Sequence, residues 1–245
     1  MMEKGRTQKM AQSTMSKFIG ILYKTDASPP ARTVLMVADL LGLNLRGQEI
    51  NPVSREQDTP EMLKKNPMKT IPIYEEGDFS LGDSHAIILY LFDKYAKPEH
   101  SYLYPTDKRK RAIINNRLFF DCGILFPRLR TILALTYLGK LTELSKSMRR
   151  NNEDAYRMLE MYLADSKYLA DNVITLADIS CLTTLSSLHG LQPIDKTKYP
   201  KLFSWYQNMS EQDVCKRINQ PGAQFHVDGL IALMQHNQSN VSSKI

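Results

Sequence analysis

The spacing of apolar residues changes once along this 245-residue chain, and that change constrains the fold more than any other feature. Up to about residue 95, short β-rich runs alternate with stretches of helical period. After a linker rich in proline and tyrosine, residues 96–105, almost no strand pattern remains. The sequence therefore predicts an α/β first domain followed by an all-helical second domain.

The first domain is expected at residues 17–95 and the second at residues 106–245. Residues 1–16 show neither a helical nor a strand period of apolar residues, so we expect a disordered extension there. The order of elements in the first domain is βαβαββα, which is that of a thioredoxin-like fold. Its strands are predicted at residues 17–23, 45–51, 71–74 and 79–81, and its helices around 34–41, 59–65 and 84–95.

Helical periods also place the elements of the second domain. Thr175 and Asp178 form a predicted capping box, in which the Asp178 carboxylate accepts a hydrogen bond from the Thr175 amide. Four helices are expected, at residues 107–138, 143–166, 176–188 and 199–209.

Composition excludes several classes of protein. Hydrophobic residues make up 42% of the chain and charged residues 24%, which is typical of a globular protein. Cys122, Cys181 and Cys215 are odd in number and far apart, which argues against a disulfide framework and a metal site and favours a reducing compartment. No apolar run is long enough to span a membrane, so we expect a cytoplasmic protein without a membrane partner.

The net charge of +6 raises the question of a nucleic-acid partner. The basic residues are scattered, and they cluster only at residues 108–111 and 148–150. Such short clusters are typical of solvated helix faces, so no nucleic-acid partner is expected.

Ser28-Pro29-Pro30 opens the first predicted helix. Proline at the first helical position favours helix initiation and leaves Ser28 at the positive end of the helix dipole. Its hydroxyl can either donate to a bound anion or simply cap the helix. The motif alone does not separate these roles, and capping is the commoner one.

Asn66-Pro67 leads to Thr70-Ile71-Pro72, just before a predicted strand. A cis proline at this place would expose the Ile71 backbone, which could then pair with an extended peptide. A trans turn proline is the more frequent alternative, since only about 5–6% of such bonds are cis.

Asp83-Ser84-His85 opens another helix. The Ser84 amide can hold a carboxylate and Asp83 can pair with an ammonium group, so together they could bind an α-amino acid. Helix capping explains Asp83 and Ser84 equally well.

In their order along the chain, these motifs resemble cytosolic glutathione transferases, in particular the insect delta and epsilon classes. The resemblance covers about residues 18–209 and is closer to epsilon. It rests on Ile21-Leu22-Tyr23 before Ser28-Pro29-Pro30-Ala31-Arg32, on Asn66-Pro67 before Thr70-Ile71-Pro72, on Asp83-Ser84-His85-Ala86-Ile87, and on residues 118–126 and 174–181.

The resemblance implies a homodimeric enzyme of the detoxification type that binds glutathione as co-substrate and transfers its thiolate to small hydrophobic electrophiles. In it, Ser28 donates its hydroxyl to the glutathione sulfur and acts as the catalytic residue. Ile71 pairs with the cysteinyl backbone, while Asp83 and Ser84 hold the γ-glutamyl end. Further glutathione contacts are expected from Gln57, Lys69, Thr70, Pro72, His85 and Arg128.

This chain departs from the family pattern at the glycyl end of glutathione. Such transferases usually carry histidines there, whereas this chain has Gln57 and Lys69. Lys69 can supply a point charge, but Gln57 cannot, so weak glutathione binding is one expectation.

An apolar electrophile pocket is expected between the two domains. Arg128 and Arg130 would lie at its rim. Its lining is predicted from Pro30, Phe119, Phe126, Leu129, Leu133 and Met209, and each of these is equally compatible with an ordinary helix-core position.

Two other functions stay open on the sequence. One is a binding protein of the same fold that carries steroids, pigments or haem with little catalysis, which the departures at Gln57 and Lys69 motivate. The other is a glutathione-dependent peroxidase or isomerase, which would share the glutathione site and differ only in the apolar pocket.

Overall fold

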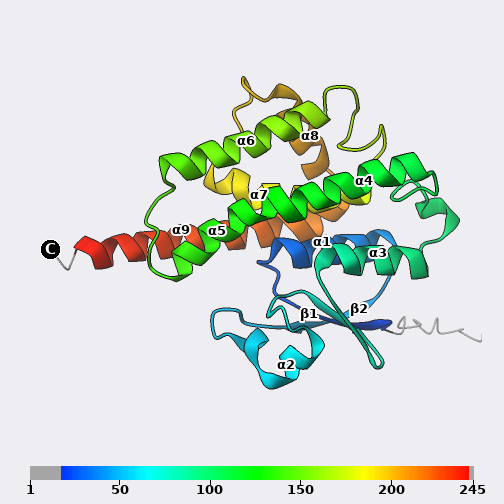
Figure 1. Ribbon diagram of the computed structural model, residues 1–245, viewed down its shortest axis with the longest axis horizontal. Helices are drawn as coiled ribbons and strands as arrows, with labels where there is room; N and C mark the ends of the chain where they lie inside the picture. The colour runs from blue at the N-terminus through cyan, green and yellow to red at the C-terminus, as the bar shows by residue number, and fades with distance from the viewer. Residues whose placement is uncertain (1–17, 243–245) are drawn as a thin grey trace, which may run out of the picture.

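A computed structural model describes residues 18–242, and it contains a small α/β domain packed against a larger helical one (Figure 1). The predicted extension at residues 1–16 lies outside the described residues. The sheet has the strand order β2-β1-β3-β4. Strand β1 runs parallel to β2 and antiparallel to β3, and β3 runs antiparallel to β4. The strands are β1 (Gly20–Lys24), β2 (Leu45–Glu49), β3 (Ile73–Glu76) and β4 (Phe79–Gly82).

Helices cover both faces of this sheet (Figure 1). Helices α1 (Pro29–Leu40) and α3 (Ser84–Tyr95) lie between the sheet and the second domain, and α2 (Pro60–Lys65) lies on the opposite face. Successive side chains of a strand point to opposite faces, so Leu22 joins the main core while Tyr23 packs in a separate cluster with Met62 of α2. The predicted βαβαββα order is confirmed.

The described residues of the second domain form helices and the loops between them, without a strand. Helix α7 is its central element, because residues 176–188 are all buried. The predicted capping box is present at its start, where the Asp178 carboxylate accepts from the Thr175 N–H at 2.9 Å. The helices are α4 (Lys108–Phe120), α5 (Phe126–Tyr137), α6 (Lys146–Tyr162), α7 (Leu176–Leu191), α8 (Pro200–Ser210) and α9 (Gln220–Ser242).

The single helix predicted at residues 107–138 is interrupted. A π-helical segment, Asp121–Leu125, separates α4 from α5, and Pro127 follows it in the first turn of α5. Proline lacks the N–H that a continuous α-helical ladder needs, so a change of helical register at this point has a local cause. A second π-helical segment, Cys215–Asn219, precedes α9.

Helix α9 has no counterpart in the predicted elements. Its apolar period is weak, because the buried face includes His226 and Asn237. The Asn237 amide donates to Thr136 O at 2.9 Å and to Leu141 O at 3.0 Å, which attaches α9 to the end of α5. Tertiary contacts therefore hold a helix that its own pattern does not reveal. No helix among the described residues is long and apolar enough to cross a membrane.

Candidate glutathione site

Strand register brings the three sequence motifs to one end of the sheet. Tyr23, near the end of β1, pairs with Ile73 at the start of β3, and Ile73 pairs with Gly82 at the end of β4. The segment after β1 leads to Ser28, the segment before β3 contains residues 71–72, and the segment after β4 is Asp83-Ser84. Three motifs that are far apart in sequence therefore border one surface.

Ser28 caps helix α1 and is partly buried. Its Oγ accepts from the Ala31 N–H over a long distance of 3.5 Å. A serine hydroxyl has one proton to donate besides its acceptor lone pairs. Capping therefore uses an acceptor position and leaves the proton available, so the two roles considered for Ser28 are compatible.

The Ile71–Pro72 peptide bond is cis, although trans was the more frequent alternative. Among the described residues, neither the N–H nor the C=O of Ile71 is hydrogen-bonded to another residue. Such a free pair of backbone groups at the edge of a site can bind an extended peptide.

The loop before Ile71 is organised by Asn66, which was not among the predicted site residues. Asn66 is 2% exposed, and its amide donates to Thr70 O at 2.8 Å and to Thr70 Oγ1 at 3.1 Å. Gly82 makes room for it, because a Cβ there would lie 2.7 Å from Asn66 Cγ. The spacing Asn66-Pro67 was a usable signal, but its partner Gly82 is visible only in the structure.

Asp83 and Ser84 begin helix α3. Asp83 has a positive φ of 70°, and its Oδ1 accepts from the N–H groups of His85 at 2.9 Å and Ala86 at 3.1 Å. Its side chain is still 43% exposed, while Ser84 is buried. The nearby His85 ring and the two backbone N–H groups lower the pKa of the Asp83 carboxyl, and the group is anionic at neutral pH. A carboxylate at a helix start can bind an ammonium group.

His85 turns away from this surface into the domain interface. Its Nε2 lies 3.2 Å from Asp121 Oδ2 and 2.9 Å from Ser180 Oγ, and its Nδ1 lies 3.5 Å from Asp83 Oδ1. Burial by itself would lower the pKa of His85, but the hydrogen bonds and charges of Asp121 and Asp83 raise it, to about 9. A protonated His85 therefore links Asp83 to the second domain.

Asp121 and Ser180 were also missed by sequence reasoning. Asp121 is 3% exposed and lies in the π-helical segment, and Ser180 donates to its Oδ2 at 2.5 Å. A buried carboxylate needs such partners. The only sequence signal was that an acidic residue, Asp121, interrupts an apolar run; nothing local connected it with His85.

The other predicted glutathione contacts lie on loops of the first domain. Gln57 belongs to a short 3₁₀ turn, Glu56–Asp58, and its Oε1 is buried without a hydrogen-bond partner among the described residues. Lys69 is exposed and has a positive φ of 58°. Thr70 is partly buried against Asn66. The side chains of Gln57, Lys69 and Thr70 therefore make fewer hydrogen bonds and ion pairs than those of Asp83 and His85.

Arg128 points elsewhere. Its guanidinium donates to Asn151 O at 2.6 Å and to Ile124 O, and it lines a cavity of about 330 Å³ together with Met148 of α6. Nε and one terminal nitrogen of Arg128 are therefore bonded within the second domain. We do not include Arg128 in the glutathione site proposed below.

The predicted apolar lining divides into two groups. Leu129 and Met209 are 0% and 2% exposed and belong to the main core, so these two predictions are corrected: helix packing covers both side chains. Phe119 is 73% exposed, and Arg130 is exposed. Pro30, Phe126 and Leu133 are partly buried.

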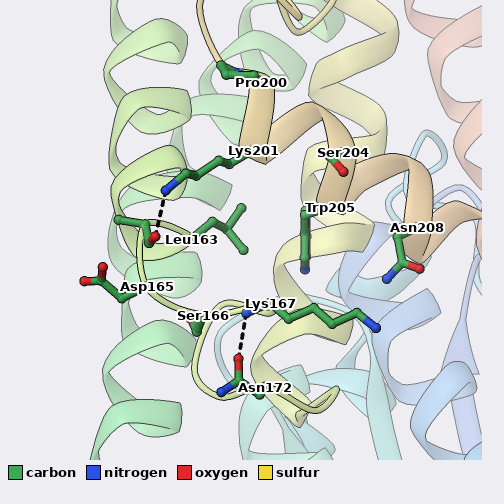
Figure 2. Close-up of a pocket in the computed structure, with 11 residues that line it drawn as sticks. Leu163, Asp165, Ser166, Lys167, Asn172, Pro200, Lys201, Ser204, Trp205 and Asn208 are labelled. Carbon is green, nitrogen blue, oxygen red and sulfur yellow. Dashed lines mark hydrogen bonds between the residues drawn. The ribbon is translucent and has the colours of Figure 1, made fainter.

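The cavity in Figure 2 is separate from all these residues. It measures about 650 Å³ and lies between the end of α6, the loop that follows it and helix α8. Lys201 crosses it to donate to Ala164 O at 2.7 Å, and Trp205 forms one wall. None of its lining residues is among the predicted site residues, so its size does not identify the functional site.

Asp83, His85 and Cys122 could offer ligand atoms to a metal, since these atoms lie within 4.8 Å of one another. Ion pairs with two carboxylates already engage His85. We assign no metal to this group.

Comparison with known proteins agrees with this geometry. The glutathione S-transferase N-terminal domain model matches residues 22–99, and the C-terminal domain model matches residues 127–213. Glutathione S-transferase 1 of Manduca sexta is 39% identical over 203 residues, which cover 82% of this chain and 92% of that protein.

Solved structures give the same result. A glutathione transferase homologue from Drosophila mojavensis with bound glutathione has a TM-score of 0.81 and 37% identity, and the match covers 89% of this chain and 97% of that one. An epsilon-class glutathione S-transferase from the housefly Musca domestica has a TM-score of 0.82 and 34% identity, with 89% and 98% covered. The carrier alternative gains no support from these relatives. The chain therefore belongs to the glutathione S-transferase family and is a glutathione transferase.

Proposed function

We propose that this enzyme activates the thiol of glutathione through the Ser28 hydroxyl and adds the resulting thiolate to small apolar electrophiles. The observation that carries the proposal is the Ser28 Oγ at the start of α1, which accepts one long hydrogen bond and donates to no other residue in the range 18–242. A hydrogen bond to the thiolate combined with the positive end of a helix dipole stabilises the anion.

The stabilisation expected from Ser28 and the helix dipole is large enough to ionise the glutathione thiol at neutral pH. A free thiol with a pKa of about 8.5 is only a few per cent ionised at neutral pH. Lowering that pKa by about two units makes the thiolate dominant and requires roughly 2.7 kcal/mol of preferential stabilisation. A charge-assisted hydrogen bond contributes about 1.5–3 kcal/mol, and the helix dipole adds to it.

The rest of the tripeptide is held by the other motifs in this proposal. The backbone of Ile71, next to Pro72, pairs with the cysteinyl residue. Asp83 binds the γ-glutamyl ammonium, and the amide of Ser84 binds its carboxylate. Thr70 and Lys69 flank the glycyl end together with Gln57, and Lys69 supplies the positive charge there. His85 acts indirectly, by orienting Asp83.

The electrophile is proposed to bind over Phe119, beside Pro30, Phe126 and Leu133, with Arg130 at the rim. Phe119 is 73% exposed, so its ring is available to contact an apolar ligand. The preferred substrates would then be apolar molecules with an electrophilic carbon.

We also propose that the enzyme is a cytoplasmic homodimer. Free cysteines at positions 122, 181 and 215 suit a reducing compartment. Strand β4 forms one edge of the sheet and carries Phe79, which is 40% exposed, as a contact for a second copy. Light scattering tests the assembly: a mass near 28.1 kDa, that of one chain, would contradict the dimer.

Ser28→Ala tests the catalytic proposal. We expect turnover with a chloronitrobenzene substrate to fall about 10- to 100-fold, with a much smaller change in glutathione affinity. Thr59→Ala is a matched control, because Thr59 also caps a helix before a proline and accepts from Met62 N–H at 3.4 Å. Both variants lose a cap, worth about 1 kcal/mol, but only the first should lose activity. Parental turnover in Ser28→Ala would remove Ser28 from the mechanism.

A further inference from the structure

Arg32, one helical turn after Ser28, is fully buried, with 0% of its surface exposed. Its guanidinium has five N–H donors, and all five have partners. Nε donates to Asn219 Oδ1 at 2.9 Å. One terminal nitrogen donates to Asp26 O at 3.2 Å and Ala27 O at 2.7 Å, and the other donates to Thr183 O at 3.0 Å and Ser187 Oγ at 3.1 Å.

These partners include no carboxylate, so the charge of Arg32 is solvated by neutral groups and is not neutralised by contact with an anion. Burial lowers the pKa of Arg32 to about 9, which still leaves it charged at neutral pH. His226 Nδ1 shares Ser187 Oγ with it, at 2.9 Å. Burial and the nearby Arg32 charge lower the pKa of His226 to about 3, so His226 stays neutral. The Asp26 carboxylate and Cys215 also act on the Arg32 charge, but Asp26 is exposed and paired with Lys24, so the buried charge behind α1 is positive.

The Arg32 guanidinium lies against the loop that leads to Ser28. The carbonyls that Arg32 holds belong to Asp26 and Ala27, the two residues immediately before Ser28. Helix α9 closes the arrangement through Gly222, where a Cβ would lie 2.4 Å from Asp26 O and 2.6 Å from Arg32 Cδ. No other residue type fits there without moving the loop that leads to Ser28.

We propose that Arg32 is a positioning residue for the thiolate: it fixes the Asp26-Ala27 loop against α7 and α9, and its unneutralised charge favours the anionic sulfur at Ser28. This inference rests on the proposed role of Ser28. It also assigns a function to α9, whose first turn and preceding π-helical segment supply Gly222 and Asn219.

Asn219→Asp separates charge from geometry. The new carboxylate keeps the shape and the acceptor that Arg32 Nε uses, and it neutralises the guanidinium. It loses the amide donor to Cys215 Sγ, while the Ser186 hydroxyl can donate to the new oxygen in place of accepting from the amide. We expect the pKa of bound glutathione to rise by about one unit, since nearby charges shift pKa values by about 1–3 units. The readouts are the pH profile of kcat/KM and the ultraviolet absorbance of the bound thiolate. A folded variant with the parental thiol pKa overturns the charge role.

A second experiment compares Gly222→Ala with Gly229→Ala. It does not require the Asn219→Asp variant to fold. Both replace a glycine of α9 by alanine, but a Cβ at Gly229 meets nothing within 4 Å. We expect Gly222→Ala to lower kcat/KM at least fivefold and to raise the thiol pKa, while Gly229→Ala stays within twofold of the parent. Parental values in both variants overturn the proposal.

The Ser28→Ala experiment distinguishes a failure of the proposed function from a failure of the Arg32 role. If Ser28→Ala keeps parental turnover, the proposed function fails. If Ser28→Ala is inactive while Asn219→Asp and Gly222→Ala keep the parental thiol pKa and turnover, only the role of Arg32 fails.

Discussion

The two ends of the proposed glutathione site are built differently. At the γ-glutamyl end, Asp83 caps a helix and touches His85, whose other nitrogen contacts the buried Asp121 and Ser180. At the glycyl end, Lys69 lies on an exposed loop and Gln57 on a short turn. Preorganised groups lose little freedom on binding, so the first end should supply most of the affinity and the second should tolerate change.

Asp83→Asn should produce the largest effect on glutathione binding. Asparagine keeps the size, the helix cap and the tolerance for positive φ, and it removes the negative charge that pairs with the ammonium and with His85. We expect the KM for glutathione to rise about 10- to 100-fold, since a charged hydrogen bond contributes about 1.5–3 kcal/mol. Steady-state kinetics would measure it.

Asp107→Asn is the matched control. Asp107 caps α4 by accepting from Lys110 N–H at 2.9 Å, but it lies in no proposed site. It should leave the KM unchanged. Equal KM values for Asp83→Asn and the parent would show that the two ends do not differ in the proposed way.

His85→Gln should have an intermediate effect, expressed in stability and its pH dependence. The pKa of His85 is raised, to about 9, above its ordinary value of about 6.5. Its ion pairs therefore stabilise the folded state fully below about pH 6.5, and that contribution is lost as the pH rises through about 9. We expect the free energy of unfolding of the parent to exceed that of His85→Gln by roughly 3 kcal/mol at pH 6 and by little at pH 10.

Denaturant unfolding at several pH values would test this expectation. A stability difference of the same size at pH 6 and pH 10 would mean that His85 is not charged in the folded enzyme, and that packing alone explains its burial.

Lys69→Asn should give the smallest effect. The ammonium group is exposed, and exposed charges contribute about 1 kcal/mol or less because water and salt screen them. We expect the KM for glutathione to rise about two- to fivefold at low salt and by less at high salt. Lys64→Asn, at an exposed position of α2, serves as control. A rise of 50-fold or more would reverse the comparison between the two ends.

Local patterns predicted the parts of the molecule that local forces determine. The strand and helix periods indicated the βαβαββα order, and the Thr175 to Asp178 spacing indicated a capping box that the structure contains. Ser28 and Asp83 were placed at helix starts for the same reason, and both cap helices. Short-range hydrogen bonding dominates at such positions, so sequence reasoning works there.

Long-range partners could not be predicted in this way. His85 meets Asp121 across 36 positions and Ser180 across 95, and Arg32 meets Asn219 across 187. Helix α9 was missed because its buried face includes polar residues that only the folded chain satisfies. Leu129 was assigned to a pocket because sequence period shows that a residue is buried but not whether it faces a core or a ligand.

The two π-helical segments have an evolutionary consequence. One supplies Asp121 to His85, and the other supplies Asn219 to Arg32, so each segment adds a contact with the first domain to those made by α7. A deletion of one residue in either segment would restore a regular helix and remove the wide turn from which Asp121 or Asn219 reaches its partner. Relatives that vary in length are therefore expected to gain or lose residues in their loops and to keep the length of these two turns.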